Sequence, residues 1–371
     1  MNKIGTETII EIYNKLGDDK SKRIFENNLL FSQTENIMFM KNIINLSYPD
    51  EFAKCEERIE KYLDNSGIKK DDEVIVYGAG GEGIRLLIMM SNINVVAFCD
   101  TDPAKHGKIY CGYNVISPEE LKNRFINNKV IITVGGDLRI NKIKNTLKES
   151  GISDNQIYVF TKMINECNIY DIYVKIKEQQ YFDSEIIISR YIDDEVFIDA
   201  GCCDFYTDIC FINNSKNKYE KIIAFEPDSR MYPVCVENSK KYNNAEILNS
   251  GLWNINTELY FDNLGMPHGG ARVSDISETD FIKIKAVTLD DVLKGDKATF
   301  IKMDVEGAEL NALIGCEKTI KKYHPKLAIS IYHKPEDIWE IPAYILSLNN
   351  NYKLYLRHYS LWQRETVIYA V

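Results

Sequence analysis

Two stretches, VIVYGAGGEG at residues 74–83 and VFIDAGCCD at residues 196–204, each lead an apolar strand into a glycine turn. A short apolar run that ends at glycine and is followed by a helical segment is typical of a buried strand in a parallel sheet. Strands and helices continue to alternate after both stretches. The sequence therefore predicts two α/β units, each with helices on the faces of a parallel sheet.

The alternation is regular in both halves of the chain. After the first stretch, the predicted helices and strands are, in order, IRLLIMMSN, VVAFCD, SPEELKNRF, KVIITVGG, INKIKNTLKESG and IYVF. In the second half, five apolar strands are separated by helical segments, and a strand pair, YKLYLRHY and TVIYAV, closes the chain. A polar, glycine-rich insertion at residues 254–297 contains a predicted β-hairpin. Five parallel strands followed by an antiparallel pair is the element order of the class I methyltransferase sheet.

These patterns predict an α/β fold with two Rossmann-like, doubly wound domains. Apolar residues recur at helical spacing before the first glycine turn, which predicts a helical segment there. The expected parts are a helical segment at 1–67, a nucleotide-binding module at 68–165, a connecting segment at 166–190 and a second sheet domain at 191–371.

The composition narrows the classes of function. The 371 residues contain 45 Lys and Arg against 55 Asp and Glu, a formal net charge of −10. An acidic surface is unsuited to gripping a phosphate backbone, so we expect no nucleic-acid partner. No apolar run approaches the ~18 residues of a membrane span, and no signal-peptide pattern is present. We therefore expect a cytoplasmic protein without membrane insertion; the oligomeric state cannot be derived from the sequence.

The first glycine turn has the spacing of a nucleotide-binding loop. Gly78, Gly80 and Gly83 form G-x-G-x-x-G, with Gly81 inside it, between a strand and a helix. Such glycines allow the backbone to approach a phosphate at the helix N-terminus, and Asp100 ends the next strand, where a ribose-binding carboxylate is expected. A purely structural turn remains the alternative.

The surrounding sequence, GAGGEG, FCDTDP and VISPEEL, resembles the nucleotide-sugar-binding Rossmann modules of sugar-modifying enzymes, including bacterial sugar acetyltransferases. The resemblance covers about residues 72–136 and implies a loop that faces a nucleotide diphosphate. An NAD site is the competing interpretation, and the sequence does not decide between them.

The second turn predicts another nucleotide site. Asp199 and Gly201 end the first strand of the second sheet, and Glu226 ends the second strand. Glycine would let the backbone lie against a ligand, the aspartate would sit near a cationic group, and Glu226 could accept both ribose hydroxyls. A carboxylate that only caps the following helix is the alternative for either acid alone.

From FIDAG onward the sequence resembles the FkbM family of methyltransferases over roughly residues 195–371. The most specific motifs are IIAFEPD, NSGLWN, IKMDVEGAE and YHKPEDIWEIP. The resemblance implies an S-adenosylmethionine-dependent O-methyltransferase. It adds Pro227, Ser250, Gly251 and Asp304 to the expected cofactor-binding residues. Family members usually carry glycine where this sequence has Phe205, and a bulky side chain beside the methionine moiety could weaken cofactor binding.

The ends of the fourth and fifth strands carry the candidate chemistry. His333 is the expected general base because of its unperturbed pKa near 6.5, and Asp304 is its expected catalytic neighbour. Asp304 and Glu306 could pair as ligands for Mg²⁺, but two carboxylates do not make a site, so we expect no metal. His268 and Arg272 in the insertion are candidates for lining the acceptor pocket.

These observations predict a methyltransferase that acts on a hydroxyl of a sugar, nucleotide-sugar or glycan-related acceptor, as in polysaccharide biosynthesis. Its N-terminal module would recognise a nucleotide or nucleotide-sugar. Two alternatives stay open. One is an NAD-dependent sugar-nucleotide oxidoreductase or epimerase, although no Tyr-x-x-x-Lys relay lies between the first loop and Gly151. The other is a non-catalytic protein that binds nucleotides in both modules.

Overall fold

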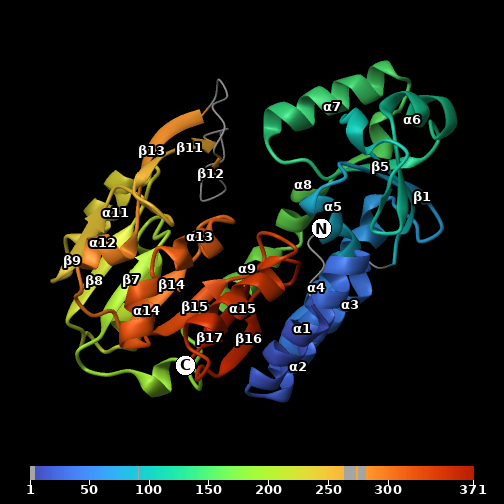
Figure 1. Cartoon of the computed structure of the whole chain (residues 1–371). Helices are drawn as coiled ribbons and strands as arrows, with labels where there is room; N and C mark the ends of the chain where they lie inside the picture. The colour runs from blue at the N-terminus through green and yellow to red at the C-terminus, as the bar shows by residue number, and fades with distance from the viewer. Residues whose placement is uncertain (1–4, 91, 263–272, 275–280) are drawn as a thin grey trace. The chain divides into compact units, whose positions relative to one another are not determined.

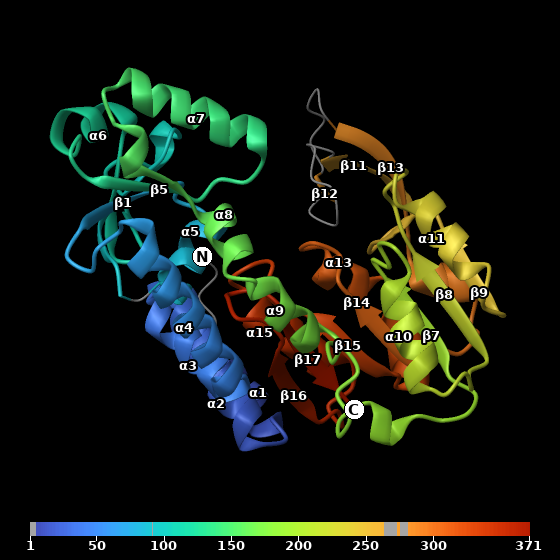
Figure 2. The same cartoon turned by 180° about the vertical axis from the view of Figure 1, so that it is seen from behind.

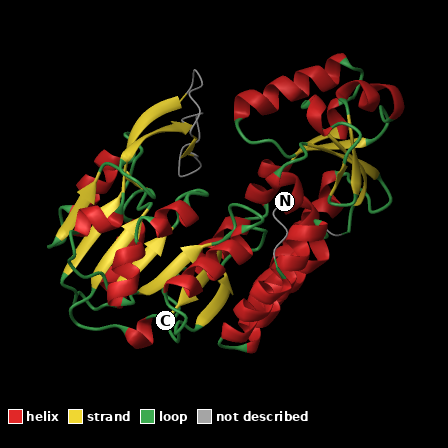
Figure 3. Ribbon diagram, viewed as in Figure 1, coloured by secondary structure: helices red, strands yellow, loops and turns green. Residues whose placement is uncertain are grey.

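The computed structural model describes residues 5–90, 92–262, 273–274 and 281–371, and it divides into two compact units (Figure 1). The seven-stranded unit comprises Met1–Phe25, Glu178–Tyr359 and Glu365–Val371, and the six-stranded unit comprises Glu26–Lys177 and Ser360–Arg364. Each unit combines helices with a mainly parallel sheet (Figure 3). The predicted α/β fold class is confirmed.

The six-stranded sheet has the order β3-β4-β2-β1-β5-β6, in which only the β3–β4 pair is antiparallel. Its strands are β1 Glu73–Tyr77, β2 Asn94–Cys99, β3 Ile109–Tyr110, β4 Tyr113–Ile116, β5 Lys129–Ile132 and β6 Ile157–Val159. The connecting helices are α5 Gly81–Met89, α6 Pro118–Arg124, α7 Asp137–Glu149, α8 Phe160–Glu166 and α9 Ile169–Lys177. The predicted strands are present, and β3 and β4, which are too short to show a hydrophobic period, were not predicted.

Local signals explain where these elements begin. The Ser117 side chain accepts a hydrogen bond from the Glu120 N–H and Pro118 occupies the first turn of α6, so this helix starts where the sequence predicts. The apolar strands β1 and β5 lie side by side at the centre of the sheet and are buried along most of their length. They form one continuous core with the facing sides of α6 and α7.

The seven-stranded sheet has the order β16-β17-β15-β14-β7-β8-β9, in which β17 is antiparallel to both of its neighbours. Its strands are β7 Val196–Ala200, β8 Lys221–Phe225, β9 Ala245–Leu248, β14 Phe300–Met303, β15 Lys326–Ser330, β16 Leu354–His358 and β17 Thr366–Ala370. The main helices are α10 Tyr206–Asn214, α11 Tyr232–Ser239, α12 Leu289–Leu293, α13 Glu309–Ile314, α14 Glu317–Tyr323 and α15 Asp337–Leu348. Five parallel strands and a closing antiparallel pair confirm the predicted order.

Helices cover both faces of this sheet. Helix α14 lies in front of the sheet in Figure 1, and α10 lies in front of it in the opposite view of Figure 2. The insertion adds a separate four-stranded sheet in which β11 Thr257–Asp262 pairs antiparallel with β13 Phe281–Val287, as predicted for a hairpin. The short strands β10 Gly251–Leu252 and β12 Val273–Ser274 flank this pair.

The N-terminal segment is helical, as predicted: α1 Thr6–Lys15, α2 Asp19–Thr34, α3 Ile37–Ser47 and α4 Pro49–Ser66. The segment does not form a unit of its own. Helix α1 packs against α15, and Asp18 pairs with Arg357 of β16 at 2.7 Å, so the first 25 residues belong to the seven-stranded unit. None of the helices in the described part of the chain is both long and apolar enough to cross a membrane.

Candidate functional site

The candidate site of the seven-stranded unit lies where the direction of winding changes. Strands β7 and β14 are neighbours, β8 and β9 follow β7 on one side, and β15 follows β14 on the other. Ligands of open α/β sheets bind outside the carboxyl ends of the strands at this position. The chain leaves this edge through the residues that follow β7, β8, β14 and β15, which include most of the predicted site residues.

A buried ion pair lies beneath the loop that follows β7. Lys302 Nζ is 2.8 Å from Asp199 Oδ1 and donates a second hydrogen bond to the Gly201 carbonyl at 2.9 Å. Both side chains are almost completely buried, and Asp208 is buried beside Asp199. Burial alone would lower the pKa of Lys302, but the negative charge of Asp199 outweighs it and raises this pKa. The lysine is therefore charged and fixes the loop through Asp199 and Gly201.

Burial raises the pKa of Asp208 well above its usual range, and the charge of Asp199 adds to the effect. Neither Asp208 oxygen has another hydrogen-bond partner, and neither does Asp199 Oδ2. A protonated Asp208 and a charged Asp199 satisfy this arrangement best. The structure thus gives the Asp199 carboxylate an internal partner in Lys302 and places it below the loop rather than at its surface.

The loop itself requires glycine at one position. Gly201 has a φ of +83°, and a Cβ built there would lie 2.0 Å from the Asp304 carbonyl oxygen. The loop that follows β7 is therefore in direct contact with the end of β14. On its other side, the Cys203 N–H donates to Glu226 Oε2 at 2.9 Å. Residues 201–203 thus lie between Glu226 and Asp304.

Glu226 is a buried carboxylate held by backbone donors. Its Oε1 accepts a hydrogen bond from the Asp228 N–H at 2.8 Å, in addition to the bond from Cys203. Burial raises the pKa of Glu226 to about 7, although the two backbone hydrogen bonds oppose the shift. Carboxylate oxygens accept more than one hydrogen bond each, so Glu226 can still accept from a ligand hydroxyl.

The other predicted cofactor residues lie beside Glu226. Pro227 follows it directly, and Gly251 approaches Pro227 so closely that a Cβ there would lie 3.8 Å from the proline ring. Ser250 is buried at the end of the β9 segment, and Asn249 donates to the Glu226 carbonyl at 2.9 Å. The structure therefore brings Glu226, Pro227, Ser250 and Gly251 together at one edge.

A cluster of titratable groups lies at the ends of β14 and β15. His333 Nε2 is 3.5 Å from Asp304 Oδ1 and 3.4 Å from Glu306 Oε2, and its Nδ1 is 2.9 Å from Glu309 Oε1. Glu309 is completely buried and also accepts the Val305 N–H at 2.9 Å. The predicted pair of His333 and Asp304 is therefore close in space.

Two tyrosines fix the Asp304 carboxylate. The Tyr181 hydroxyl donates to Asp304 Oδ2 at 2.8 Å, and the Tyr332 hydroxyl donates to Oδ1 at 3.2 Å. Burial raises the pKa of both phenols well above the usual value, and Asp304 raises it further. Both tyrosines therefore remain donors at any physiological pH, and they orient Asp304 by two hydrogen bonds.

The surroundings of His333 change the role expected of it. Burial alone would lower its pKa, but the nearby carboxylates of Glu306, Glu309 and Asp304 outweigh burial and raise the pKa to about 11. With only these protein partners, the imidazole is protonated at neutral pH. A protonated ring cannot accept a proton from an acceptor hydroxyl. That His333 acts as the general base therefore stays a prediction, and its surroundings favour the protonated ring.

In the glycine loop of the six-stranded unit, backbone conformation or packing requires glycine at some positions but not at others. Gly78 has a φ of +121°, and a Cβ on Gly83 would lie 2.7 Å from both the Gly78 carbonyl and the Phe98 ring. A Cβ on Gly81 would meet the ends of two flexible side chains, Gln363 at 3.3 Å and Arg364 at 3.8 Å. A Cβ on Gly80 would meet no atom within 4 Å, so packing within the protein does not require glycine there.

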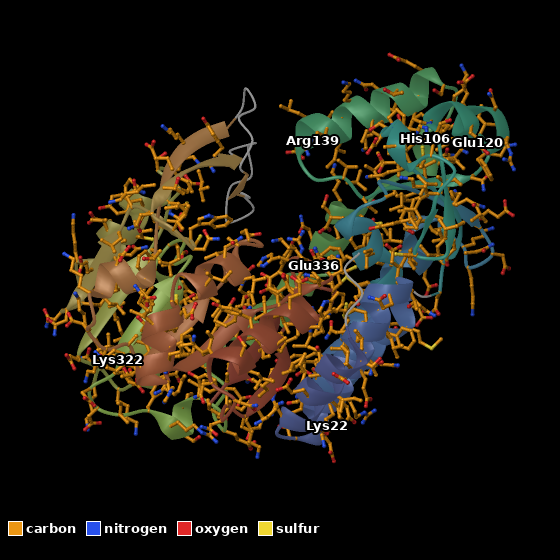
Figure 4. The ribbon with its side chains drawn as sticks, in the orientation of Figure 1. Lys22, His106, Glu120, Arg139, Lys322 and Glu336 are labelled. Carbon is orange, nitrogen blue, oxygen red and sulfur yellow. The ribbon has the colours of Figure 1, made fainter. Side chains whose placement is uncertain are left out.

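Asp100 lies directly beneath this loop. Its Oδ2 accepts the Ala79 N–H and the Lys105 ammonium, both at 2.9 Å, and its Oδ1 accepts the Asp102 N–H at 2.9 Å. His106, labelled in Figure 4, is hydrogen-bonded to the Asp100 carbonyl at 2.8 Å. Burial would raise the pKa of Asp100, but these donors outweigh it and lower the pKa. The predicted ribose ligand is therefore already bound by three protein donors.

The two units match different protein families. Residues 199–355 match the model of the methyltransferase FkbM domain, and residues 70–158 match the model described as C2185-like, N-terminal. The first match includes the Gly201 turn, Glu226 and the cluster of Asp304, Glu309 and His333 described above. Residues 199–355 are similar to this family and are called the FkbM methyltransferase domain below. The resemblance expected from the sequence is confirmed for this part of the chain.

Several solved structures are similar to parts of the chain. Methyltransferase FkbM from Methylobacillus flagellatus is 19% identical, covers 92% of this chain and 100% of its own, with a TM-score of 0.48. A putative methyltransferase from Streptococcus mutans in complex with SAH is 11% identical, and the match covers 54% of this chain and 98% of that protein, with a TM-score of 0.32. UDP-D-quinovosamine 4-dehydrogenase from Vibrio fischeri is 22% identical, and the match covers 25% of this chain and 84% of that protein, with a TM-score of 0.22. No curated protein matches the chain.

Phe205 of the FkbM methyltransferase domain lies away from the loop surface. It has a φ of +71°, so the backbone adopts the left-handed conformation that favours the glycine usual in the family. Its ring is completely buried, with its centroid 6.0 Å from that of Tyr242. The bulky side chain therefore packs into the core instead of occupying the space above the glycine turn.

Three residues that shape the site of the seven-stranded unit were not predicted. Lys302 could have been found, because a lysine inside the apolar strand FIKM needs a buried partner. Asp208 has a similar signal in the apolar helix of residues 206–214. No sequence signal marks Tyr181, because it lies 123 residues before Asp304 and only the fold brings the two residues together. His268 and Arg272 lie outside the described residues.

Proposed function

We propose that the FkbM methyltransferase domain transfers a methyl group from S-adenosylmethionine to a hydroxyl of a sugar, nucleotide-sugar or glycan-related acceptor. The observation that carries the proposal is the position of the Gly201 turn between two fixed carboxylates, Glu226 and Asp304. One carboxylate suits the ribose of a nucleoside cofactor, and the other lies among the groups suited to orienting a hydroxyl.

The residues present fit the cofactor. Gly201 lets the loop contact Asp304 at the switch point, and Glu226 is buried, oriented by two N–H groups and able to accept from ribose hydroxyls. Ser250 and Pro227 line the same edge. Asp304 and Glu306 provide negative charge near the loop, which suits the cationic sulfonium and ammonium groups of S-adenosylmethionine. When bound, the cofactor supplies an electrophilic methyl group.

Asp304 is the residue best placed to receive the acceptor proton. Its carboxylate is held by Tyr181 and Tyr332, so it can accept a hydrogen bond from a hydroxyl in a fixed direction. A carboxylate of this cluster would take the hydroxyl proton as the acceptor oxygen gains the methyl group that the cofactor would supply. His333, 3.5 Å away, keeps Asp304 in place and balances part of the negative charge. We keep both residues as the proposed catalytic pair.

The six-stranded unit is proposed to bind a nucleotide or nucleotide-sugar through its glycine loop, within a module at 68–165. The support is Gly80, the loop glycine that neither its conformation nor its neighbours explain. Its bare backbone at the start of α5 suits a diphosphate. Asp100 acts in this proposal by holding the loop through Ala79. The net charge of −10 supports the further proposal that neither unit binds nucleic acid.

A methyl-transfer assay tests the proposed reaction. The full chain is incubated with S-adenosylmethionine labelled in the methyl group and with a panel of free sugars and UDP-sugars. We expect label in an ether-linked methyl group of a sugar acceptor, and none with Asp304→Asn protein. Labelling of amines or RNA instead of hydroxyls would contradict the proposed acceptor. Calorimetry with UDP-sugars and NAD tests the other unit: tighter NAD binding would favour an oxidoreductase module.

A further inference from the structure

We propose that Asp304, Glu309 and His333 form a binding site for a divalent cation of the Mn²⁺ type. Each offers one potential ligand atom, and these atoms all lie within 4.8 Å of one another. The three side chains come from the end of β14, the first turn of α13 and the segment after β15. The sequence-based expectation of no metal considered only two carboxylates, and the fold adds Glu309 and His333.

The first argument is an unsatisfied buried carboxylate. Glu309 is completely buried, and its Oε2 has no hydrogen-bond partner in the part of the chain that the structure describes. A buried polar atom without a partner costs about 1–3 kcal/mol, and a charged one costs more. Its other oxygen accepts the Val305 N–H and is 2.9 Å from His333 Nδ1, so the carboxylate is directed at the cluster. A cation beside Glu309 would satisfy the remaining oxygen.

The second argument is the geometry of His333. Its side chain is only 10% exposed, yet among the described residues neither ring nitrogen makes a well-aligned hydrogen bond, although Asp304 and Glu306 lie 3.5 and 3.4 Å from Nε2 and Glu309 lies 2.9 Å from Nδ1. Two ligands bound to one cation at ~2.1 Å are about 3 Å apart at right angles. The two nitrogens point away from each other, so one ion would use only one of them, and the site rests on the three ligand atoms that lie within 4.8 Å of one another.

The third argument is charge. Three carboxylates, those of Asp304, Glu306 and Glu309, surround a single imidazole, so the cluster is negative whether or not His333 is protonated. A divalent cation would balance it. Imidazole together with carboxylates suits Mn²⁺ and similar transition ions better than Mg²⁺, which prefers oxygen ligands and retains its water. Glu306, at 29% exposure, can add a ligand from the open side.

The role of the cation in methyl transfer rests on the proposed function, whereas the binding of the cation to the cluster does not. A divalent cation beside Asp304 would lower the pKa of an acceptor hydroxyl bound there. The proton could then leave to a carboxylate of the cluster or to water. With the cation bound, His333 would be a neutral ligand and not a proton acceptor.

Binding of Mn²⁺ to the full chain, freed of metal by dialysis against EDTA, tests the site without any methyl transfer. Electron paramagnetic resonance of free Mn²⁺ gives the stoichiometry and Kd, and pulsed measurements detect the ¹⁴N coupling of a bound imidazole. We expect one Mn²⁺ per chain with a ¹⁴N signal. In His333→Ala the signal should disappear and the Kd should rise at least tenfold, while the exposed Asp296→Asn should behave as wild type.

Because Glu309 is buried, Glu309→Gln could fail to fold, so Asp304→Asn, at a half-buried position, serves as the second ligand variant. It should also weaken binding at least tenfold. No binding at millimolar Mn²⁺, or binding unchanged in both His333→Ala and Asp304→Asn, overturns the site. A parallel titration of the metal-free protein with S-adenosylmethionine keeps the two proposals apart. Cofactor binding without Mn²⁺ binding contradicts only the metal site, and the reverse contradicts only the proposed cofactor.

Discussion

The two glycine loops of the chain share one construction. In the six-stranded unit, Asp100 at the end of β2 accepts the Ala79 N–H of the loop at 2.9 Å. In the seven-stranded unit, Glu226 at the end of β8 accepts the Cys203 N–H of the loop at the same distance. In both units, the carboxylate of the second strand thus fixes the turn that follows the first strand.

The carboxylates differ in what surrounds them. Asp100 has a lysine partner, Lys105, at 2.9 Å, and its donors lower its pKa. Glu226 is held by two N–H groups, and burial raises its pKa to about 7. The ends of the next strands differ more: β5 leads into Thr133 and two glycines, whereas β14 and β15 lead into Asp304 and His333. The two units thus share the carboxylate that fixes the loop, and they differ in the groups at the ends of the next strands, where we propose that the methyl-transfer chemistry resides.

The largest expected effect comes from the cluster that only the seven-stranded unit has. We predict that His333→Ala lowers turnover by roughly 10²-fold, the effect expected when a reacting group such as Asp304 loses the partner that keeps it in place. The affinity for S-adenosylmethionine should change little. Steady-state kinetics and a cofactor titration of the same protein check both statements. Turnover within twofold of wild type would remove His333 from the catalytic pair.

The next effect concerns the ion pair below the second loop. Lys302→Met leaves Asp199 charged and buried without its partner, which should lower the free energy of unfolding by about 3–5 kcal/mol. Thermal and urea unfolding measure it, with the exposed Lys318→Met as control. The double variant Lys302→Met with Asp199→Asn should lose less than the single variant. A double variant that is less stable than the single one would contradict a paired role.

The ribose carboxylate gives a smaller effect that distinguishes the loops. Glu226→Ala should weaken S-adenosylmethionine binding by on the order of 1–3 kcal/mol, because ligand hydroxyls lose their acceptor. The corresponding change in the other unit, Asp100→Ala, should leave the affinity for this cofactor unchanged. Calorimetry on both variants makes the comparison. If Asp100→Ala has the larger effect, the two loops have been assigned to the wrong ligands.

The smallest effect is a pH dependence. A carboxyl with a pKa near 7 is mostly neutral at pH 6 and mostly ionised at pH 8, so cofactor affinity should rise roughly tenfold between them. The sign follows from the charged form being the better acceptor of two hydroxyls. Glu226→Gln should bind more weakly and show no such rise. An affinity that falls with increasing pH in the wild type would assign the titration to another group.

Much of the fold could be predicted because its strands are apolar runs that end at glycine or acid, as at Gly78, Gly201 and Glu226. The site could be predicted in part, since residues at strand ends meet at one edge by topology. The protonation state and the hydrogen-bond partners of each group could not be predicted. His333 looks like a neutral base in sequence, and only the fold shows the buried Glu309 beside it. Asp100 likewise looks like a ribose ligand until Lys105 and two N–H groups are found on its oxygens.

The most direct test is a calorimetric titration of the full chain with S-adenosylmethionine, repeated on Glu226→Ala and Gly80→Val. Valine at Gly80 meets no protein atom near its Cβ, so this variant should fold and affect only a ligand of the first loop. We predict one S-adenosylmethionine per chain, weakened by Glu226→Ala and unaffected by Gly80→Val. Binding that is abolished by Gly80→Val and insensitive to Glu226→Ala would contradict the assignment of the methyl-transfer chemistry to the seven-stranded unit.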